Sequence, residues 1–236
     1  MIDIVDVFRQ MNIPLSDGQV GQLNRYYEML VEKNKVMNLT AITEYDDVVI
    51  KHFADSAALG AVYDLTEGKS LIDVGCGAGF PGLVLKIVYP GLSITLLDSL
   101  NKRVNFLNEV IEELGLTGIS TVHGRAEDFG RNPDYREKYD LAVSRAVANL
   151  SSLSEYCLPF VKVNGKFISY KATDCNEEVT NAENAIRTLK GNISDILTYT
   201  IPGTDLERKF IVIHKKELLP KRFPRKAGMP TKEPLK

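Results

Sequence analysis

Short apolar runs rich in β-branched residues alternate with amphipathic stretches along the chain from Lys69 onward. The runs that predict strands are Ser70–Val74, Ser93–Asp98, Ile119–Val122, Tyr139–Ser144, Gly165–Lys171, Ile193–Ile201 and Lys209–His214. Helical periodicity separates most of them, notably over Asn101–Leu114, Ser151–Val161 and Asp174–Lys190. This alternation, with nearly continuous apolar strands, is typical of a parallel sheet covered by helices on both faces. The pattern therefore predicts an α/β fold.

The end of the predicted sheet departs from the parallel pattern. Only Pro202 to Arg208 separate the last two strands, and this connection is too short for a parallel crossover. We therefore expect an antiparallel hairpin at the sheet edge.

The N-terminal region has a helical pattern of its own. Ser16 to Gln19 reads as a capping box, and apolar residues at helical spacing extend the helix to about Val36. Thr43 and Asp46 fit a second cap, which predicts a helix over Tyr45–Val62. Helices with single apolar stripes rarely fold alone, so we expect this region to pack on the domain that comes after it.

Composition sets the broad class. The chain has 236 residues, of which 44% are hydrophobic and 25% charged, enough for one ordinary domain with an appendage. No apolar run approaches the roughly 18 residues of a membrane helix, and the N-terminus MIDIVDVFRQ carries acids where a signal peptide carries basic residues. The three cysteines and three histidines are scattered. We therefore expect a cytoplasmic protein with no membrane contact, disulfide framework or metal site.

Charge is distributed unevenly. Lys215–Lys236 contains eight basic and two acidic residues, so this tail carries +6 within a chain of net charge −2, and the remainder carries −8. A basic tail beside an acidic body suggests contact with a polyanion, because phosphate neutralisation supplies affinity for nucleic acid. A solvated, disordered tail is an equal alternative. Its prolines, Pro220, Pro224, Pro230 and Pro234, favour an extended chain without regular structure.

The candidate chemistry begins with LIDVGCGAGFPG, Leu71–Gly82, where a strand runs into Gly75, Gly77 and Gly79. Glycines at this turn let a backbone approach a bound nucleotide or nucleoside closely. The dinucleotide motif GxGxxG requires glycine at position 80, where this chain has Phe80, and no GK[ST] is present downstream for a P-loop. A tight turn that binds nothing is the alternative, but three glycines after Asp73 exceed what a turn requires.

Acidic residues lie just after the next two strands. Asp98 ends the second strand, where its carboxylate can accept hydrogen bonds from both ribose hydroxyls of a nucleoside, and Ser99 adjoins it as a further candidate. An N-cap role for Asp98 before Asn101 is an alternative that could coexist with ribose binding. The third strand leads into GRAED, where the amide of Ala126 and the side chain of Glu127 can reach an adenine.

In this order, Asp73, the GxGxG turn, Asp98 and the RAED segment resemble the class I S-adenosylmethionine-dependent methyltransferases. The resemblance implies S-adenosylmethionine as the cofactor and a seven-stranded Rossmann-like sheet with an antiparallel terminal hairpin. Together with the helical N-terminal pattern and the basic tail, it leads us to expect an N-terminal helical cap (1–65), a methyltransferase domain (66–218) and a basic Pro-rich tail (219–236). A short-chain dehydrogenase would need a Tyr-x-x-x-Lys pair, and none of the ten tyrosines has one.

The segment after the fourth predicted strand narrows the acceptor class. Enzymes that methylate exocyclic amino groups carry an Asn/Asp-Pro-Pro-aromatic motif there, whereas this chain has SRAVANL, Ser144–Leu150. Cys157 lies inside a predicted helix, which favours packing over a nucleophilic role. An acceptor that needs no covalent attack remains.

Several further segments are specific: MNLTAIT (37–43), KHFADS (51–56), LLDSLNKRVNFL (96–107), GRAEDF, SRAVA and PRKAGMPTKEPL. With the glycine turn, they resemble the ribosomal RNA small-subunit methyltransferase G family, also called glucose-inhibited division protein B. The resemblance implies N7 methylation of a guanosine in 16S ribosomal RNA near the decoding region, with that RNA or the small ribosomal subunit as partner, and we expect a monomer. Lys33 stands where the family usually has tryptophan, and Ala227–Gly228 where it often has Pro-Gly.

Guanine N7 has an in-plane lone pair and no hydrogen, so the reaction needs alignment rather than a general base, and no acid or base is assigned. A cation beside N7 would oppose transfer. We therefore expect Arg145 to bind the cofactor's carboxylate or the edge of its pocket, as the resemblance also suggests, with a surface ion pair as the alternative. Phe80 should line the methionine and nucleoside side, unless it is a core residue of the following helix.

Candidate RNA contacts are basic or aromatic residues scattered along the chain: His52, Arg125, Lys171, Arg208, Arg225 and Lys226. His52 and Asp55 lie about one helical turn apart and could face the pocket, although a helix-surface pair is an equal alternative. Two other functions stay open: methylation of a small molecule or a protein, and an RNA-binding protein that holds S-adenosylmethionine without turning it over.

Overall fold

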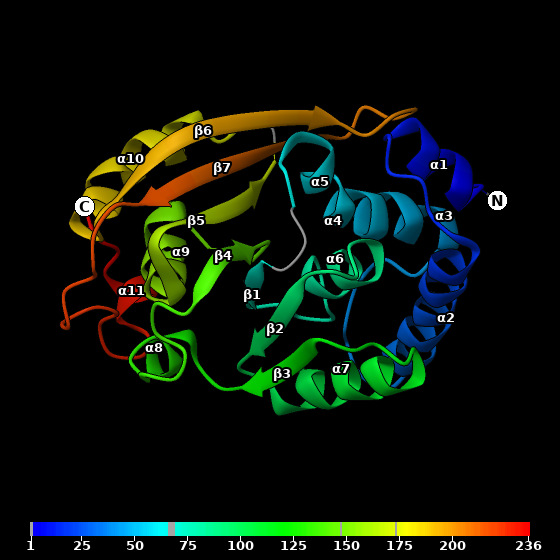
Figure 1. Cartoon of the computed structure of the whole chain (residues 1–236), viewed down its shortest axis with the longest axis horizontal. Helices are drawn as coiled ribbons and strands as arrows, with labels where there is room; N and C mark the ends of the chain where they lie inside the picture. Colours follow the sequence, from blue (N-terminus) through cyan, green and yellow to red (C-terminus); the bar gives the residue numbers. More distant parts are fainter. Residues whose placement is uncertain (1, 66–68, 147, 173) are drawn as a thin grey trace.

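The computed structural model describes residues 2–65, 69–146, 148–172 and 174–236. The expected domain boundary between residues 65 and 66 adjoins 66–68, which lie outside the described residues, as does Val147 of the SRAVA motif. One central sheet runs through the molecule, with helices on both of its faces (Figure 1).

The sheet has seven strands in the order β3-β2-β1-β4-β5-β7-β6. Their bounds are β1 (Ser70–Val74), β2 (Ser93–Asp98), β3 (Ile119–His123), β4 (Tyr139–Ser144), β5 (Val161–Lys171), β6 (Gly191–Thr200) and β7 (Glu207–Lys215). The pairs among β1 to β5 are parallel, whereas β7 is antiparallel to both β5 and β6. The predicted strands and terminal hairpin are confirmed, with β7 inserted between β5 and the edge strand β6.

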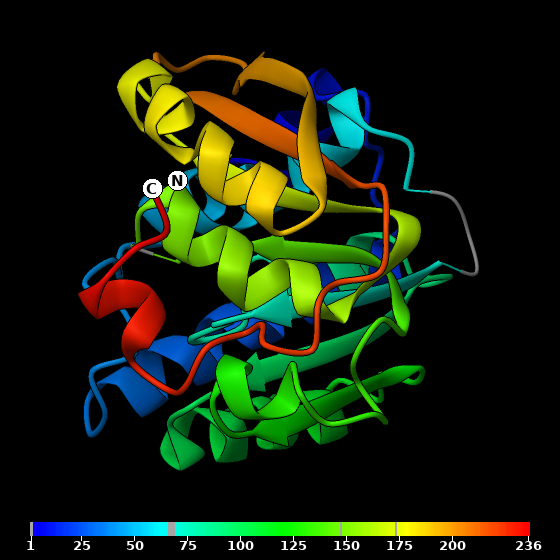
Figure 2. The same ribbon diagram turned by 90° about the vertical axis from the view of Figure 1, so that its left-hand side faces the viewer.

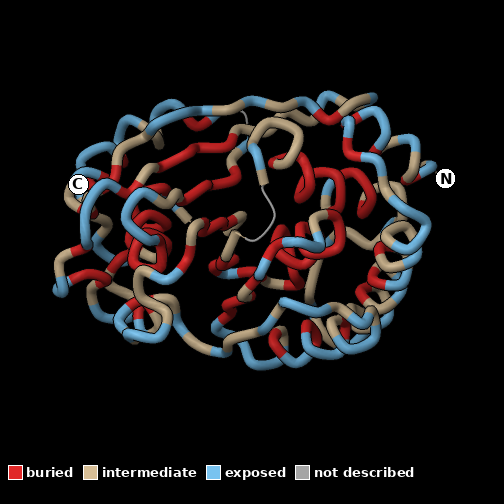
Figure 3. The backbone as a smooth tube through the Cα atoms, in the orientation of Figure 1, coloured by how far each residue is buried: buried red, intermediate tan, exposed pale blue. Residues whose placement is uncertain are grey.

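Helices cover the two faces of the sheet as the alternating pattern predicted. On one face, α6 (Gly82–Val88) and α7 (Asn101–Glu113) share a core cluster with the N-terminal helices. The other face carries α8 (Ala126–Phe129), α9 (Leu150–Cys157) and α10 (Asn176–Thr188). Figure 3 shows the inner strands β1, β4 and β7 as mostly buried, whereas the edge strands β3 and β6 are mostly not buried. The helix predicted over Ser151–Val161 ends early, because a 3₁₀ turn over Leu158–Phe160 leads directly into β5.

The N-terminal region packs on the sheet domain, as expected. It contains α1 (Ile4–Gln10), which the sequence patterns did not predict, and α2 (Asp17–Asn34). The capping box of α2 is confirmed, because the Ser16 hydroxyl accepts from the Gln19 amide at 3.3 Å and the Gln19 side chain accepts from the Ser16 amide at 2.9 Å. Tyr26 of α2 is fully buried, and its ring lies against Phe53, Phe80 and Phe106.

The second predicted N-terminal helix is interrupted. It consists of α3 (Tyr45–Val48), a π-helical segment over Val49–Ala54, α4 (Asp55–Ala57) and α5 (Leu59–Val62). The predicted cap at Thr43 is wrong: Glu44 is the N-cap residue and makes no side-chain capping bond. The sequence patterns did not indicate this interruption, because π-helical turns are rare and occur as short bulges inside helices that are otherwise α-helical.

The tail corrects another expectation, because it is neither extended nor free in solvent. It packs along α9 and contains the short helix α11 (Met229–Lys232) (Figure 2). The Arg136 guanidinium donates to the carbonyls of Leu219 and Phe223, each at 2.8 Å, and both of these residues are buried. Proline lacks an amide donor but keeps its carbonyl acceptor, so a proline-rich segment has few backbone donors for its own carbonyls. Here the Arg136 guanidinium supplies donors to the tail carbonyls instead.

Candidate functional site

The glycine turn lies where the sheet reverses its strand order. β1 ends at Val74 between β2, which leads on to β3, and β4, which leads on to β5. Such a switch point leaves a crevice at the carboxyl ends of the strands. Gly75 and Gly77 have φ of +76° and +61°, a conformation that other residues adopt only with strain. The amide of Gly75 donates to the Leu97 carbonyl at 2.8 Å, which fastens the turn to the end of β2.

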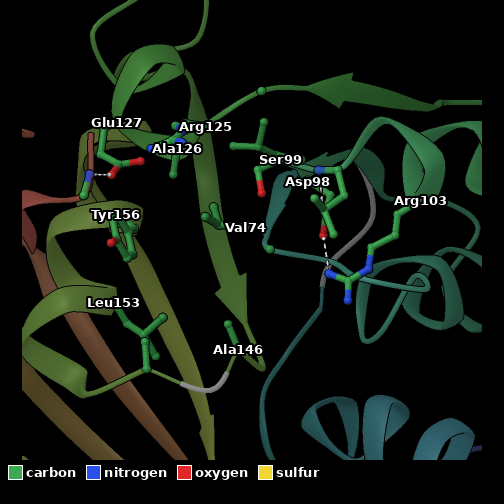
Figure 4. A pocket seen from close by; sticks show the side chains of 16 residues that line it. Val74, Asp98, Ser99, Arg103, Arg125, Ala126, Glu127, Ala146, Leu153 and Tyr156 are labelled. Atoms are coloured by element: carbon green, nitrogen blue, oxygen red, sulfur yellow. Dashed lines mark hydrogen bonds and ion pairs between the residues drawn. The ribbon is translucent and has the colours of Figure 1, made fainter. Parts of the chain in front are cut away.

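A cavity of about 480 Å³ lies at this crevice, within the range of small-molecule sites (Figure 4). Its walls come from the ends of β1, β2 and β3, from α8 and α9, and from the tail. The lining residues are Val74, Gly75, Leu97, Asp98, Ser99, Leu100, Arg103, Gly124, Arg125, Ala126, Glu127, Ala146, Ala148, Leu153, Tyr156 and Gly228. We call this space the first cavity.

Asp98 has a fixed carboxylate at one side of the first cavity. Its Oδ2 accepts from the Gly77 amide and its Oδ1 from the Leu100 amide, each at 2.9 Å. An ionised carboxylate has about four acceptor sites, so both oxygens retain capacity for a ligand's hydroxyls. The alternative that Asp98 caps the following helix is wrong, since the N-cap of α7 is Leu100 and no side chain caps it.

The opposite side of the first cavity is formed by Glu127 and the tail. Glu127 is only 6% exposed, and its Oε1 accepts from the amide of Gly228 at 2.7 Å. Figure 4 shows this bond joining α8 to the C-terminal segment, with Tyr156 beside it. A residue from the end of the chain thus orients an acidic side chain that the sequence pattern assigned to adenine.

A second cavity, of about 680 Å³, adjoins the first and shares Ala146 and Ala148 with it. Its other lining residues are Lys51, His52, Asp55, Arg145, Asn149, Tyr170, Lys171, Ala172, Glu178 and Arg208. Four of its side chains are basic at neutral pH, but two of them share one carboxylate: Asp55 accepts from Arg145 at 2.6 Å and from Arg208 at 2.5 Å. Lys171 donates to Glu178 at 2.7 Å.

His52, on the wall of the second cavity, contacts both an aromatic ring and a cation. Its ring stacks on Phe80 with centroids 4.3 Å apart, and Arg145 lies over the same phenyl ring at 5.1 Å. Burial, and then the charge of Arg145, lower the pKa of His52 to about 4. The imidazole is therefore neutral at pH 7, which limits the positive charge on this wall.

Asp73 supports the glycine turn from behind. Its Oδ2 accepts from the Gly82 amide at 2.7 Å, whereas its Oδ1 has no hydrogen-bond partner among the described residues. Burial raises the pKa of Asp73 to about 7, against the opposing effect of the Gly82 amide. A Cβ at Gly82 would come within 2.8 Å of the Asp73 Cβ, so this contact requires glycine.

Some of the expected cofactor residues line one of the two cavities, and the others pack in the protein behind them. Gly75, Asp98, Ser99, Ala126 and Glu127 line the first cavity, whereas Arg145 lines the second. Gly77 reaches the site through its bond to Asp98. Gly79 serves packing, because a Cβ there would lie 2.7 Å from the Tyr26 hydroxyl. Phe80 is 7% exposed and belongs to the core as well as to the His52 stack.

The expected RNA contacts are brought together only in part. His52, Lys171 and Arg208 line the second cavity, and Arg125 lines the first. Arg225 lines neither of these cavities: its Nε and Nη2 bind the carboxylate of Glu155, which is fully buried. Lys226 comes next as an exposed residue of the docked tail.

Among the lining residues that reasoning from the sequence missed, three have polar or backbone groups at the cavity: Arg103, Tyr156 and Gly228. Arg103 lies in the first turn of α7 and its Nη1 is 3.5 Å from Asp98 Oδ2, so its nearness to Asp98 in sequence was a usable signal. Tyr156 and Gly228 reach the cavity only through the packing of α9 and the tail, which no local pattern reports.

The first cavity fits a nucleoside-bearing cofactor such as S-adenosylmethionine. Positive-φ glycines allow close approach at one edge, the Asp98 carboxylate has spare acceptor sites, and Arg103 Nε is buried without a partner among the described residues. Within the described residues, no group of three or more His, Cys, Asp or Glu side chains could hold a metal ion. No helix among them is long and apolar enough to cross a membrane.

The family model and the relatives that match this chain carry the same family description. The family model described as rRNA small subunit methyltransferase G matches residues 19–206. The ribosomal RNA small subunit methyltransferase G of Lachnoclostridium phytofermentans is 51% identical over 227 residues, covering 96% of this chain and 94% of that protein. The protein of the same name from Alkaliphilus oremlandii is 50% identical over 240 residues, and each chain is covered completely.

Solved structures show the fold. TYW2 of M. jannaschii, determined in complex with AdoMet, has a TM-score of 0.55 at 10% identity, covering 74% of this chain and 79% of that one. MtNAS, determined in complex with MTA and tNA, has a TM-score of 0.54 at 15% identity, covering 82% of this chain and 69% of that one.

Proposed function

Because the chain belongs to the rRNA small subunit methyltransferase G family, we propose that it transfers a methyl group from S-adenosylmethionine to N7 of a guanosine in 16S ribosomal RNA. One observation carries the proposal: a cavity suited to a nucleoside cofactor adjoins a basic cavity, and the two share the wall at Ala146 and Ala148. The methyl donor and the acceptor base can thus lie next to each other where the two cavities adjoin.

The cofactor residues would divide the ligand between them. Asp98 offers its carboxylate to the ribose hydroxyls, and Ala126 and Glu127 lie on the side assigned to adenine. Gly75 keeps the backbone close to the ligand, and Gly77 holds Asp98 through a 2.9 Å bond. Arg145 lines the second cavity next to Ala146, which both cavities share, and its guanidinium is suited to a carboxylate. When bound, S-adenosylmethionine supplies the electrophilic methyl group.

The second cavity supports an acceptor that needs no base. Guanine N7 attacks with a lone pair and releases no proton, so the chain has only to align the base and exclude water. Its charge balance suits this task, because Asp55 pairs with both Arg145 and Arg208 and His52 is neutral at pH 7. Positive charge that develops on the guanine therefore meets a wall whose cations are largely compensated.

The RNA backbone would be held at the rim. Arg125 is exposed beside the first cavity, and Lys171 and Arg208 lie at the second. The Arg125 guanidinium can neutralise a phosphate beside a base that enters the second cavity. Arg208 is already paired with Asp55 and Lys171 with Glu178, so these two would contact a phosphate as members of ion pairs. We propose that the protein acts as a monomer in the cytoplasm, on the small ribosomal subunit or its RNA.

A transfer assay tests the proposal. Purified protein is incubated with S-adenosylmethionine carrying a labelled methyl group and either small ribosomal subunits or naked 16S RNA. We expect label in the RNA fraction. Label in a small molecule or a protein instead would favour the other methyltransferase functions. Cofactor binding without transfer to any of these would favour a non-catalytic RNA-binding protein.

A further inference from the structure

The C-terminal segment contributes to the wall of the first cavity through Gly228. Gly228 lines this cavity, and its amide donates to Glu127 Oε1 at 2.7 Å. We propose that residues 228–232 are a working part of the cofactor site, so that docking of the tail and binding of S-adenosylmethionine stabilise each other. The identity of the ligand rests on the proposed function.

Helix α9 holds this segment from behind. The Ser152 hydroxyl donates to the Pro230 carbonyl at 2.6 Å, and the hydroxyls of Tyr156 and Thr231 are 2.6 Å apart. Leu153 and Tyr156 of the same helix line the first cavity. One helix therefore contacts both the ligand space and the segment that closes its far side (Figures 2 and 4).

The hydrogen bond between Gly228 and Glu127 provides free energy that couples docking of the tail to cofactor binding. Its side chain is nine-tenths buried, and the structure gives the amide of Gly228 as a donor to its carboxylate. A buried carboxylate that loses such a donor must turn toward another donor or toward water, and this change alters the surface offered to adenine. Hydrogen bonds to charged groups are strong enough for this loss to weaken cofactor binding about tenfold or more.

Gly228 also suits the position conformationally. Its φ is +82°, and this left-handed conformation directs the amide to Glu127 just before α11 begins. The basic side chains of this part of the tail do not contribute to the cavity wall in this way, because Lys226, Lys232 and Lys236 are exposed. The backbone of the tail thus serves the cofactor cavity, while its charges remain available to a polyanion.

Truncation separates these two roles. A chain that ends at Lys226 keeps buried Phe223 and the Arg225–Glu155 ion pair but lacks Gly228 and α11. Calorimetry with S-adenosylmethionine in the absence of RNA should give a dissociation constant about tenfold higher, or more, than that of the full chain. The matched control, Lys232→Ala with Lys236→Ala, removes charge from the same segment and should leave the dissociation constant within twofold.

Hydrogen exchange of the full-length protein gives a second readout that does not depend on a variant. Reciprocity of coupling requires the cofactor to slow amide exchange in residues 226–232 by the same factor by which the docked tail strengthens binding. Unchanged exchange there at saturating S-adenosylmethionine, or unchanged affinity in a folded truncated chain, would overturn the proposal. Methyl transfer to RNA by the full chain is scored separately, so failure of the coupling and failure of the proposed function remain distinguishable.

Discussion

The buried carboxylate of Asp55 accepts a hydrogen bond of 2.6 Å from Arg145, across 90 positions of sequence. Asp55 is 1% exposed, and its other oxygen accepts from Arg208 at 2.5 Å. This arrangement joins the N-terminal helical region to the ends of β4 and β7 beside the second cavity. It also keeps the two arginines of the cavity wall from acting as free cations.

Replacing Asp55 should therefore destabilise the fold. Asp55→Asn leaves two guanidinium groups without their shared counter-ion, and we expect the free energy of unfolding to fall by about 3 kcal/mol, the lower end for breaking a buried ion pair because both arginines are partly exposed. Urea denaturation measures the change. The control is Asp47→Asn, whose ion pair with Lys51 is nearly half exposed and should contribute about 0.5 kcal/mol or less. Equal effects of the two substitutions would contradict the buried role.

Asp98 provides a prediction on cofactor binding alone. Asp98→Asn keeps an oxygen for one backbone amide but loses the charged acceptor expected at the ribose, so the dissociation constant for S-adenosylmethionine should rise about ten- to a hundredfold. Calorimetry measures it without RNA. Asp128→Asn is the matched control, because Asp128 is exposed in the neighbouring RAED segment. If both variants bind as the unmodified chain does, the ribose assignment is wrong.

Asp73 predicts a pH dependence of stability. Burial raises the pKa of its carboxyl to about 7, well above the ordinary value of 3.8, so the folded state favours the protonated form. The resulting stabilisation is complete below about pH 4 and is lost as the pH rises to about 7. Asp73→Asn stays neutral and keeps an acceptor for the Gly82 amide. Its stability relative to the unmodified chain should therefore increase by up to about 1.4 kcal/mol per pH unit across this interval and level off above pH 8.

Urea denaturation at pH 5, 6, 7 and 8 checks this dependence. The diagnostic quantity is the difference between the two unfolding free energies at each pH, which cancels the titration of the other groups. A difference that stays constant from pH 5 to pH 8 would show that Asp73 titrates in its ordinary range.

Arg225 and Lys226 are adjacent basic residues for which the structure predicts different effects. Arg225→Ala leaves the fully buried Glu155 carboxylate with only the backbone amide of residue 225 as its remaining donor from the tail, so unfolding should become easier by about 2 kcal/mol. Lys226→Ala, at an exposed position, should change stability by about 0.5 kcal/mol or less. Thermal and urea unfolding measure both. A stable Arg225→Ala chain with weakened RNA binding would instead restore Arg225 as an RNA contact.

Much of the fold could be predicted because its signals are local. Strands such as Ser93–Asp98 and the capping box at Ser16 depend on residues that are close in sequence, and the structure has them where the patterns indicate. The π-helical segment Val49–Ala54 and the docked tail could not be predicted in this way. The tail is held by side chains such as Arg136, about 80 to 90 positions away, so its conformation is decided by tertiary contacts.

The candidate site shows the same division. Gly75, Asp98 and Glu127 lie at or just after strand ends, where the order of the parallel strands brings them to one edge of the sheet. Gly228 comes from the last residues of the chain, and Asp55 from the N-terminal region, and neither contact has a spacing rule. Arg225 was expected at the RNA because its charge is visible in the sequence, whereas its partner Glu155 is visible only in the fold.

The most direct test of the central claim is mass-spectrometric mapping of methylated nucleosides in 16S ribosomal RNA with and without this protein. Small subunits or naked RNA that lack the modification are incubated with the purified chain and S-adenosylmethionine, digested and analysed for 7-methylguanosine. We expect one new 7-methylguanosine in the RNA, at a single position. A 7-methylguanosine content that is the same with and without the protein would contradict it.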